Sequence, residues 1–292
     1  MKKILITGAN SYIGTSFSDY LAQWPEEYRV DTLDMLDESW RQADFSDYDS
    51  VFHVAGIAHA DTGSISEAQR ELYYRVNTDL TIETAAKAKA DGAKQFIFMS
   101  SAIVYGSSAG LGKSKHITRD TPVSPANCYG DSKVKAEEGI LPLNGDGFRV
   151  VVLRPPMIYG PGSKGNYPVL ARLAGALPVF PKVENQRSML YITNLMEFVR
   201  LMIVHEEQGI FWPQNDEYTN TTRMAQLIAA THGKKLVAVP GFTWALKLLG
   251  CATGLVNKAF GSLTYDQSIS EYKENYRIVN FEDSIRETEA SV

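Results

Sequence analysis

The chain has 292 residues, a formal net charge of −5 at pH 7 and hydrophobic residues at 44% of its positions, which is typical of a folded globular protein. The negative charge gives no electrostatic footprint for DNA or RNA, so we expect no nucleic-acid partner. Its two cysteines, Cys128 and Cys251, cannot form a disulfide scaffold and match no metal-ligand spacing, so we expect a reducing, cytoplasmic environment and no metal site.

Apolar runs typical of strands alternate with helical stretches in the first half of the chain. This alternation predicts an α/β fold in which helices cover both faces of a doubly wound parallel sheet. The expected strands are Lys3–Thr7, Arg29–Asp34, Ser50–Ala55, Gln95–Ser100 and Val150–Arg154, and the expected helices include Gly14–Gln23 and Val76–Asp91.

The first strand runs into a glycine turn with the sequence TGANSYIG. Gly8 allows a tight turn, Gly14 allows close packing of the helix that follows, and the N–H groups at the start of that helix suit a pyrophosphate. Ser11 stands where a third glycine is expected, which weakens the match, although its hydroxyl can itself bond a phosphate. The turn therefore predicts a dinucleotide site.

The second strand ends on an acidic residue, Asp34, 20 positions after Gly14. A carboxylate at this distance binds the ribose hydroxyls of NAD. Met35 follows it, and not an arginine that could pair with the 2′-phosphate of NADP. The expected cofactor is therefore NAD.

Two motifs in the middle of the chain carry the chemistry. Tyr129 and Lys133 are four positions apart in a predicted helix, so they share one face. An ammonium beside a phenol lowers the pKa of the phenol, which can then take a proton from a hydroxyl while hydride leaves the same carbon. The fourth strand delivers Ser100 and Ser101 to the carboxyl end of the sheet, where a serine can bond the reacting oxygen and relay its proton to Tyr129.

After about residue 165, glycine and proline recur every few residues, which predicts a smaller, mixed second domain and a substrate cleft between the two domains. The stretch 236–256 is the most membrane-like, but Pro240 and Lys247 interrupt it, so we expect a buried or dimer-facing helix and no membrane span. The expected boundaries are 1–165 with a return segment at about 188–212 for the cofactor domain, and 166–187 with 213–292 for the substrate domain.

Six motifs in register resemble one family: TGANSYIG, FHVAG (52–56), Asn77 in RVNTDL, MSSAIVYG (99–106), YGDSK (129–133) and LRPPMIYGPG (153–162). Over about residues 3–205 the chain is similar to the extended short-chain dehydrogenase/reductases, specifically to their NAD-dependent sugar-nucleotide epimerase/dehydratase group. The resemblance implies a Rossmann-type fold, an enzyme like UDP-glucose 4-epimerase, a UDP-linked nucleotide-sugar substrate and a homodimer.

The resemblance also implies roles for residues of the reaction centre. Tyr129 is the expected catalytic base, Lys133 lowers the pKa of Tyr129 and holds the nicotinamide ribose, and Ser101 bonds the reacting hydroxyl of the sugar. In the substrate domain, Arg187 is similar to the arginine that grips the substrate diphosphate, and Asn166 is an expected nucleotide contact.

The resemblance further implies a set of cofactor contacts, among which Asp44 and Phe45 look like the pair that brackets adenine. The full set is Thr7, Gly8, Ser11, Tyr12, Ile13, Gly14, Asp34, Asp44, Phe45, Ala55, Gly56, Asn77, Ser100, Tyr129, Lys133, Pro155 and Ile158.

Departures from the family pattern narrow the reaction. Ala102 and Ile103 stand where 4,6-dehydratases carry an Asp-Glu pair, and neither can move a proton, so a dehydratase is disfavoured. Met157 stands where epimerases commonly carry an asparagine.

Three functions remain open. The first is a 4-epimerase of a UDP-hexose or UDP-N-acetylhexosamine that works through a 4-keto intermediate with tightly held NAD. The second is an NAD(P)H-dependent 4-ketoreductase of a UDP-4-keto-6-deoxy sugar. The third is a non-catalytic dinucleotide sensor, against which the presence of Tyr129, Lys133 and Ser101 argues.

Overall fold

The computed structural model describes residues 1–57, 65–241 and 260–290, and the chain divides into two compact units. Unit 1 contains Met1–Gly106, Pro122–Pro155 and Leu195–Pro213; unit 2 contains Ser107–Thr121, Pro156–Asn194 and Gln214–Val292. The sequence-based boundaries place residues 107–121, 156–165 and 188–194 in the first domain, whereas the structure groups them with unit 2. The reason is non-local strand pairing, as in the pair of His116–Ile117 with Thr264–Tyr265.

A parallel sheet of six strands forms the centre of unit 1, in the order β10–β6–β4–β3–β1–β2. Every residue of β3 and β4 is buried, as expected for strands with helices on both faces. The strands are β1 (Lys2–Thr7), β2 (Tyr28–Leu33), β3 (Ser50–His53), β4 (Gln95–Met99), β6 (Arg149–Leu153) and β10 (Gly209–Phe211).

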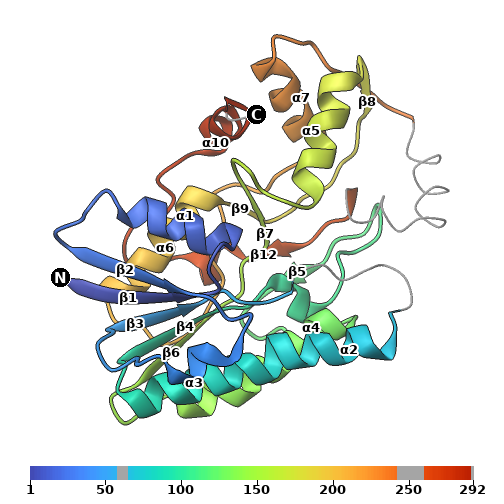
Figure 1. Cartoon of the computed structure of the whole chain (residues 1–292). Coiled ribbons are helices and arrows are strands. Elements are labelled where there is room, and N and C mark those ends of the chain that lie inside the picture. Colours follow the sequence, from blue (N-terminus) through green and yellow to red (C-terminus); the bar gives the residue numbers. More distant parts are fainter. Residues whose placement is uncertain (58–64, 242–259, 291–292) are drawn as a thin grey trace. The chain divides into compact units, whose positions relative to one another are not determined.

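Helices cover both faces of this sheet (Figure 1), which confirms the predicted doubly wound α/β class. One face carries α2 (Glu67–Tyr74), the π-helical turn η2 (Arg75–Asp79), α3 (Leu80–Asp91) and α4 (Cys128–Ile140), and the other carries α1 (Tyr12–Leu21) and α6 (Ile192–Val204). Short 3-10 turns are η1 (Glu38–Gln42), η3 (Ala102–Tyr105) and η4 (Leu141–Leu143).

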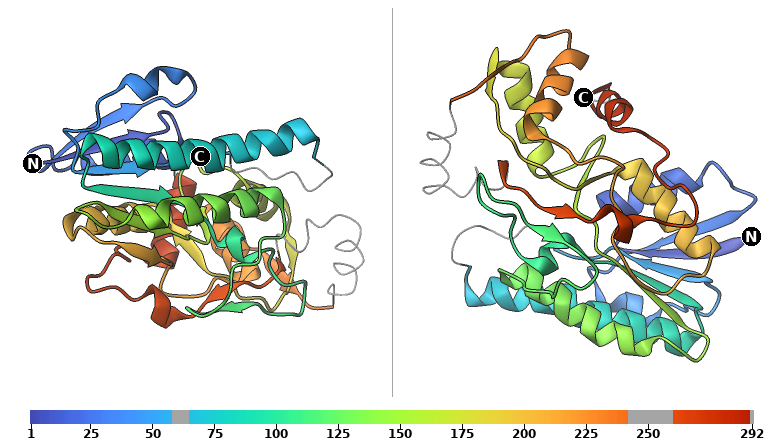
Figure 2. Two further views of the ribbon diagram at one scale, coloured as in Figure 1. Left: turned by 90° about the horizontal axis from the view of Figure 1, so that it is seen from below. Right: turned by 180° about the vertical axis from the view of Figure 1, so that it is seen from behind.

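The five predicted strands are confirmed to within two residues at each end, but other elements were not expected from the sequence. The sixth strand, β10, and helix α6 are additional. The helix predicted over Val76–Asp91 is part of a longer rod, because α2, η2 and α3 follow one another without a break (Figure 2).

The core under α3 and α4 is built from large sheet residues and small helix residues. Phe96 and Phe98 of β4 belong to the same buried cluster as Ala85 and Ala88 of α3 and Ala136 of α4. Alanines let the helix backbones approach the sheet closely, and each buried phenylalanine contributes about 1.5–3 kcal/mol to folding. This packing holds α4, which carries Tyr129 and Lys133, against the sheet.

The strand order reverses between β1 and β3, since the chain moves outward to β2 on one side and to β4, β6 and β10 on the other. Ligands of open α/β sheets bind at the carboxyl ends of the strands beside such a reversal. The glycine turn follows β1, and the FHVAG motif begins in β3 and continues into the loop after it, so both predicted cofactor segments lie at this point.

Unit 2 consists of three short parallel strand pairs and three described helices. Helices α5 and α10 both pack against α7. The elements are β5 (His116–Ile117) with β12 (Thr264–Tyr265), β7 (Met157–Tyr159) with β9 (Met189–Tyr191), β8 (Val179–Pro181) with β11 (Val237–Val239), the helices α5 (Asn166–Ala176), α7 (Thr221–Thr231) and α10 (Phe281–Ala290), and the 3-10 turn η5 (Gln267–Ser270).

The helix expected within residues 236–256 falls mostly on 242–256, which lies outside the described residues. Within the described ranges, no helix is both long enough and apolar enough to cross a membrane.

Candidate active site

The glycine turn after β1 is a place where two loops approach closely. Gly8 has a φ of +107°, and a Cβ added to it would lie 2.7 Å from the backbone nitrogen of Ala55. Ala55 in turn donates its N–H to the carbonyl of Thr7 at 3.0 Å. Only glycine fits this crossing, because any side chain would fill the space between the turn and the loop after β3.

Ser11 is the N-cap of α1. Its hydroxyl oxygen accepts a hydrogen bond from the N–H of Gly14 at 3.1 Å, and a Cβ on Gly14 would lie 2.7 Å from that oxygen. The serine thus uses an acceptor site for the helix and keeps its O–H as a donor. Tyr12 and Ile13 are in the first turn of α1. The N–H groups of a first helical turn have no acceptor within the helix.

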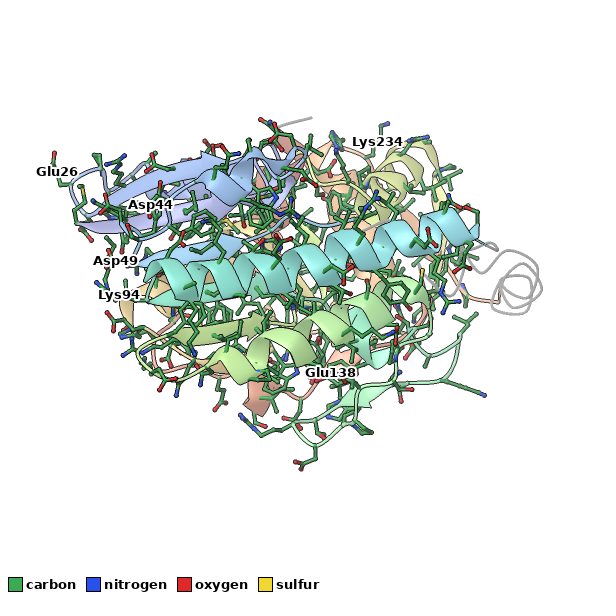
Figure 3. All side chains as sticks on the ribbon, turned by 60° about the horizontal axis from the view of Figure 1, so that its bottom comes forward. Glu26, Asp44, Asp49, Lys94, Glu138 and Lys234 are labelled. Atoms are coloured by element: carbon green, nitrogen blue, oxygen red, sulfur yellow. The ribbon has the colours of Figure 1, made fainter. Side chains whose placement is uncertain are left out.

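Two exposed carboxylates follow β2. Asp34 accepts the N–H of Leu36 at 3.0 Å, and Asp44 accepts the N–H of Ser46 at 2.8 Å. The second bond holds the pKa of Asp44 below its usual range. Asp44 lies on the surface of unit 1 (Figure 3), where its carboxylate is accessible to a ligand.

The structure corrects the expectation for Phe45. Its side chain is 0% exposed in the core of unit 1, with the ammonium of Lys87 5.1 Å from its ring centre. Its N–H donates to the carboxylate of Asp91 at 3.0 Å. The enclosed ring of Phe45 therefore cannot stack on an adenine, and a cofactor contact through the rest of this residue stays a prediction.

Asn77 joins the loop after β3 to α4. Its Oδ1 accepts the N–H of Ile57 at 2.8 Å, and its Nδ2 donates to the carbonyl of Ile57 and to the hydroxyl of Ser132, both at 3.1 Å. A Cβ on Gly56 would lie 3.1 Å from Asn77 Oδ1 and 3.4 Å from Lys133 Nζ. Asn77 lies in the π-helical turn η2, a feature often found at functional sites.

His53 is a buried, neutral link between the end of β1 and helix α3. Its Nδ1 lies 2.8 Å from the hydroxyl of Thr7, and its Nε2 lies 3.1 Å from the hydroxyl of Thr81. Burial, with a smaller effect of the charge on Lys133, lowers the pKa of His53 to about 3. The imidazole thus stays uncharged and has a structural role.

The reaction centre lies at the start of α4, which Asn127 caps by accepting the N–H of Gly130 at 2.9 Å. The hydroxyl of Ser101 lies close enough to the phenol of Tyr129 to lower the pKa of the phenol. Lys133 Nζ donates to the carbonyl of Met99 at 2.9 Å and is 5% exposed. The structure therefore brings together the three side chains expected to carry the reaction.

Burial controls the electrostatics of this centre. Desolvation raises the pKa of Tyr129 to about 12, and the nearby phenol of Tyr73 adds to the rise, while the hydrogen bond from Ser101 opposes it. Desolvation also lowers the pKa of Lys133 to about 8, and the carboxylate of Glu137 opposes that change. The sequence-based expectation was a lowered pKa for Tyr129; in the protein chain by itself, desolvation outweighs any effect of Lys133.

Ser100 and Pro155 contribute to the frame around Ser101. The buried hydroxyl of Ser100 donates to the carboxylate of Glu137. The carbonyl of Pro155 accepts the N–H of Ala102 at 2.8 Å. Ser100 is thus occupied by Glu137, and its expected contact with the cofactor stays a prediction.

The remaining expected residues belong to unit 2. Ile158 is in β7, and Asn166 is the exposed first residue of α5. Arg187 exchanges two backbone hydrogen bonds with Thr219, at 3.0 and 2.8 Å, and burial lowers the pKa of its guanidinium to about 10.

Two residues near the reaction centre were missed from the sequence. The ring of Tyr73, on α2, lies 6.2 Å from that of Tyr129. Glu137 lies one turn after Lys133, and the four-residue spacing of Tyr129, Lys133 and Glu137 is a signal that could have found it.

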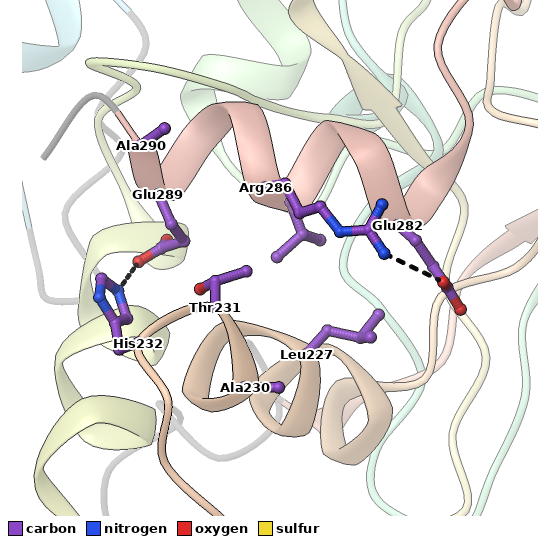
Figure 4. Close-up of a pocket in the computed structure, with 9 residues that line it drawn as sticks. Leu227, Ala230, Thr231, His232, Glu282, Arg286, Glu289 and Ala290 are labelled. Carbon is purple, nitrogen blue, oxygen red and sulfur yellow. Dashed lines mark hydrogen bonds and ion pairs between the residues drawn. The ribbon is translucent and has the colours of Figure 1, made fainter.

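A cavity of about 500 Å³ lies elsewhere, between α7 and α10 of unit 2 (Figure 4). Two polar contacts flank it, a hydrogen bond between His232 and Glu289 at 2.7 Å and an ion pair between Arg286 and Glu282 at 3.9 Å. None of its lining residues is one of the expected site residues. Among the described residues, no cluster of three or more His, Cys, Asp or Glu side chains could hold a metal ion.

The chain has a Rossmann-type fold, with a glycine turn after β1 and with Tyr129 and Lys133 in the first half of α4, near Ser101. The sequence model of the NAD dependent epimerase/dehydratase family matches residues 4–211. A UDP-glucose 4-epimerase from Vibrio cholerae is 31% identical over 297 residues, which cover 94% of this chain and 89% of that protein. The chain belongs to the NAD dependent epimerase/dehydratase family.

Solved structures share the fold. A UDP-glucuronic acid 4-epimerase from Bacillus cereus in complex with NAD has a TM-score of 0.74 at 17% identity, over 99% of this chain and 98% of that one. A dTDP-4-dehydrorhamnose reductase from Clostridium acetobutylicum also has a TM-score of 0.74, at 20% identity over 98% of both chains. At these identities the similarity establishes the fold alone.

Proposed function

We propose that the protein is an NAD-dependent sugar-nucleotide 4-epimerase that acts on a UDP-hexose or UDP-N-acetylhexosamine through a 4-keto intermediate. The observation that carries the proposal is the placement of Ser101 beside the phenol of Tyr129, with Lys133 one turn further along α4. The similarity to the Vibrio cholerae UDP-glucose 4-epimerase, which extends over nearly the whole chain, supports it.

The residues of unit 1 fit NAD. A Cβ on Gly8 would collide with the neighbouring loop, and a Cβ on Gly56 would make a tight contact with Asn77. The first turn of α1 presents N–H groups suited to a pyrophosphate. In this proposal, Asp34 binds the ribose hydroxyls of NAD and Asp44 contacts its adenine. The buried ring of Phe45 takes no part in that contact. NAD supplies the acceptor for hydride from the sugar, and later the donor.

The side chains of the reaction centre move and hold the proton. Tyr129 takes the proton of the sugar hydroxyl, and Ser101 bonds the same oxygen and keeps it within reach of the phenol. Because burial raises the pKa of Tyr129 to about 12, the phenolate needs positive charge close by in the loaded enzyme. Lys133 supplies one such charge at pH values below its pKa of about 8.

The two units divide the work in this proposal. Unit 1 binds NAD and holds the reaction centre, and unit 2 binds the nucleotide part of the substrate through Arg187 and Asn166. A guanidinium suits two phosphate oxygens, and burial of Arg187 strengthens its attraction to them.

The proposal also includes a homodimer, which the family resemblance supports, and a cytoplasmic location, which the low cysteine count supports. Light scattering of the purified protein would measure the mass of the oligomer.

A 4-ketoreductase is the second candidate, because Met157 replaces the asparagine that epimerases commonly carry. One experiment separates the two. The purified protein is denatured and assayed for released NAD, and the native protein is incubated with UDP-glucose and UDP-N-acetylglucosamine without added NADH. Released NAD together with a 4-epimer supports the epimerase. Absence of both, with oxidation of NADH when a UDP-4-keto-6-deoxy sugar is added, supports the reductase.

The variant Tyr129→Phe is the control for either reaction. It removes only the phenol oxygen and is expected to abolish turnover while leaving NAD binding intact. Unchanged turnover would remove Tyr129 from the mechanism. The same variant separates either enzyme from a dinucleotide sensor, which would show no turnover before or after the substitution.

A further inference from the structure

A buried ion pair lies behind the reaction centre. Glu137 is on α4 and Arg154 is at the end of β6, and their side chains are 3% and 10% exposed. Arg154 Nε donates to the carboxylate at 3.1 Å, and Nη2 donates to the same oxygen. Burying two charges is costly unless further hydrogen bonds satisfy them, so the other partners of this pair indicate what it does.

Those partners anchor both ends of the turn that carries Ser101. The hydroxyl of Ser100 donates to Glu137, and Nη1 of Arg154 donates to the hydroxyl of Tyr105 at 2.7 Å. Ser101 is the N-cap of the 3-10 turn η3, and Tyr105 is the last residue of this turn. The ion pair therefore holds the chain immediately before the N-cap and at the last residue of the turn, and Ser101, which lies beside the phenol of Tyr129, stands between these two points.

The pair also sets the charge around Lys133. Tyr129, Lys133 and Glu137 follow one another at four-residue spacing on one face of α4. In the described part of the chain, the titratable groups whose electrostatics are linked to Lys133 are Glu137 and His53. His53 stays neutral because its pKa is about 3, so Glu137 is the anion that opposes desolvation of the ammonium.

We propose that the Glu137–Arg154 pair positions the reaction centre, by directing Ser101 at Tyr129 and by keeping the ammonium of Lys133 charged. Both are positioning residues, since they act through Ser101 and Lys133. The inference rests on the proposed function of the Tyr129 site.

The test is Glu137→Gln, which keeps the shape of the side chain and removes its charge. We expect the pKa of Lys133 to fall by about one unit, equivalent to a tenfold change in its protonation equilibrium. The pKa is measured in the ligand-free protein from the ¹³Cε signal of Lys133, assigned by its loss in Lys133→Arg. In the epimerase assay, we expect kcat to fall about tenfold with KM nearly unchanged, and the alkaline limb of the pH profile to move to lower pH.

Glu197→Gln is the matched control, since Glu197 pairs with Arg200 on α6 and is likewise mostly buried. Its carboxylate accepts hydrogen bonds from Arg200 and Tyr20, neither of which belongs to the proposed reaction centre. This variant is expected to leave the titration of Lys133 unchanged. Ser100→Ala keeps the ion pair and removes one anchor of the turn. It should lower kcat without shifting the pKa of Lys133, and Ser100→Thr should restore kcat.

A wild-type titration of Lys133 together with a wild-type kcat in Glu137→Gln would overturn the inference. If Glu137→Gln does not fold, the Ser100→Ala variant provides the test instead. A wild-type kcat in Ser100→Ala would then overturn the inference. The titration does not depend on activity, so failure of this inference is distinguishable from failure of the proposed function, which Tyr129→Phe tests.

Discussion

Gly14 and Ser11 depend on each other: the hydroxyl of Ser11 caps α1 by accepting the N–H of Gly14, and a Cβ on residue 14 would lie 2.7 Å from that hydroxyl oxygen. The serine that weakens the match to a three-glycine turn is therefore a helix cap. It satisfies a donor that would otherwise have no partner at the start of the helix.

Ser11→Ala should lower the free energy of unfolding by about 1 kcal/mol, because it removes the cap. Ser11→Gly should cost only a few tenths of a kcal/mol, because glycine is itself tolerated at an N-cap. Urea unfolding of both variants measures the difference. Equal stability of Ser11→Ala and the wild type would show that the cap contributes nothing.

Gly8→Ala should destabilise the protein and weaken NAD binding. The φ of +107° strains any side chain, and the added Cβ would also meet the backbone of Ala55. Gly92→Ala is the matched control, with a φ of +103° and no atom within 4 Å of the added Cβ. Backbone strain alone costs about 1–2 kcal/mol. Any further loss of unfolding free energy in Gly8→Ala, compared with Gly92→Ala, therefore measures the collision with Ala55. Calorimetric titration with NAD should show weaker binding in Gly8→Ala only.

The protein should lose stability in acid through His53. Its folded pKa of about 3 lies below the usual value of 6.5, so the unfolded chain binds a proton that the folded chain does not. The stabilisation is therefore complete above pH 6.5 and is lost as the pH falls from 6.5 toward 3, by up to about 1.4 kcal/mol per pH unit. His53→Gln removes this contribution. The unfolding free energies of the wild type and of His53→Gln should differ at pH 7 and converge at pH 5. An equal difference at the two pH values would contradict the lowered pKa of His53.

Asp44 and Phe45 are neighbours in sequence with separate expected effects. Asp44→Ala should weaken NAD binding and leave stability nearly unchanged, since the carboxylate is exposed. Phe45→Leu should lower the unfolding free energy by about 1–2 kcal/mol and leave NAD affinity unchanged, because the ring belongs to the core. A loss of affinity in Phe45→Leu at constant stability would restore the adenine contact expected from the sequence.

Local features of the sequence were sufficient for five strands of the central sheet, for the glycine turn and for the placement of Tyr129 and Lys133 on one helix. Each of these depends on residues within one element, where apolar periodicity and helical spacing determine which side chains share a face. The match of six motifs to one family came from the same local signals, and the family comparison agrees with it.

Only the tertiary structure decided the partners of the side chains. Phe45 is enclosed because it meets α3 from a distant part of the chain, and Ser100 bonds Glu137 across 37 positions. Asn77 clamps Ile57, and residues 107–121 join unit 2 through strands near residue 264. Burial then raised the pKa of Tyr129, where spacing alone had suggested a fall. Spacing along the chain determines which face a residue occupies, whereas desolvation and hydrogen-bond partners depend on segments that only folding brings together.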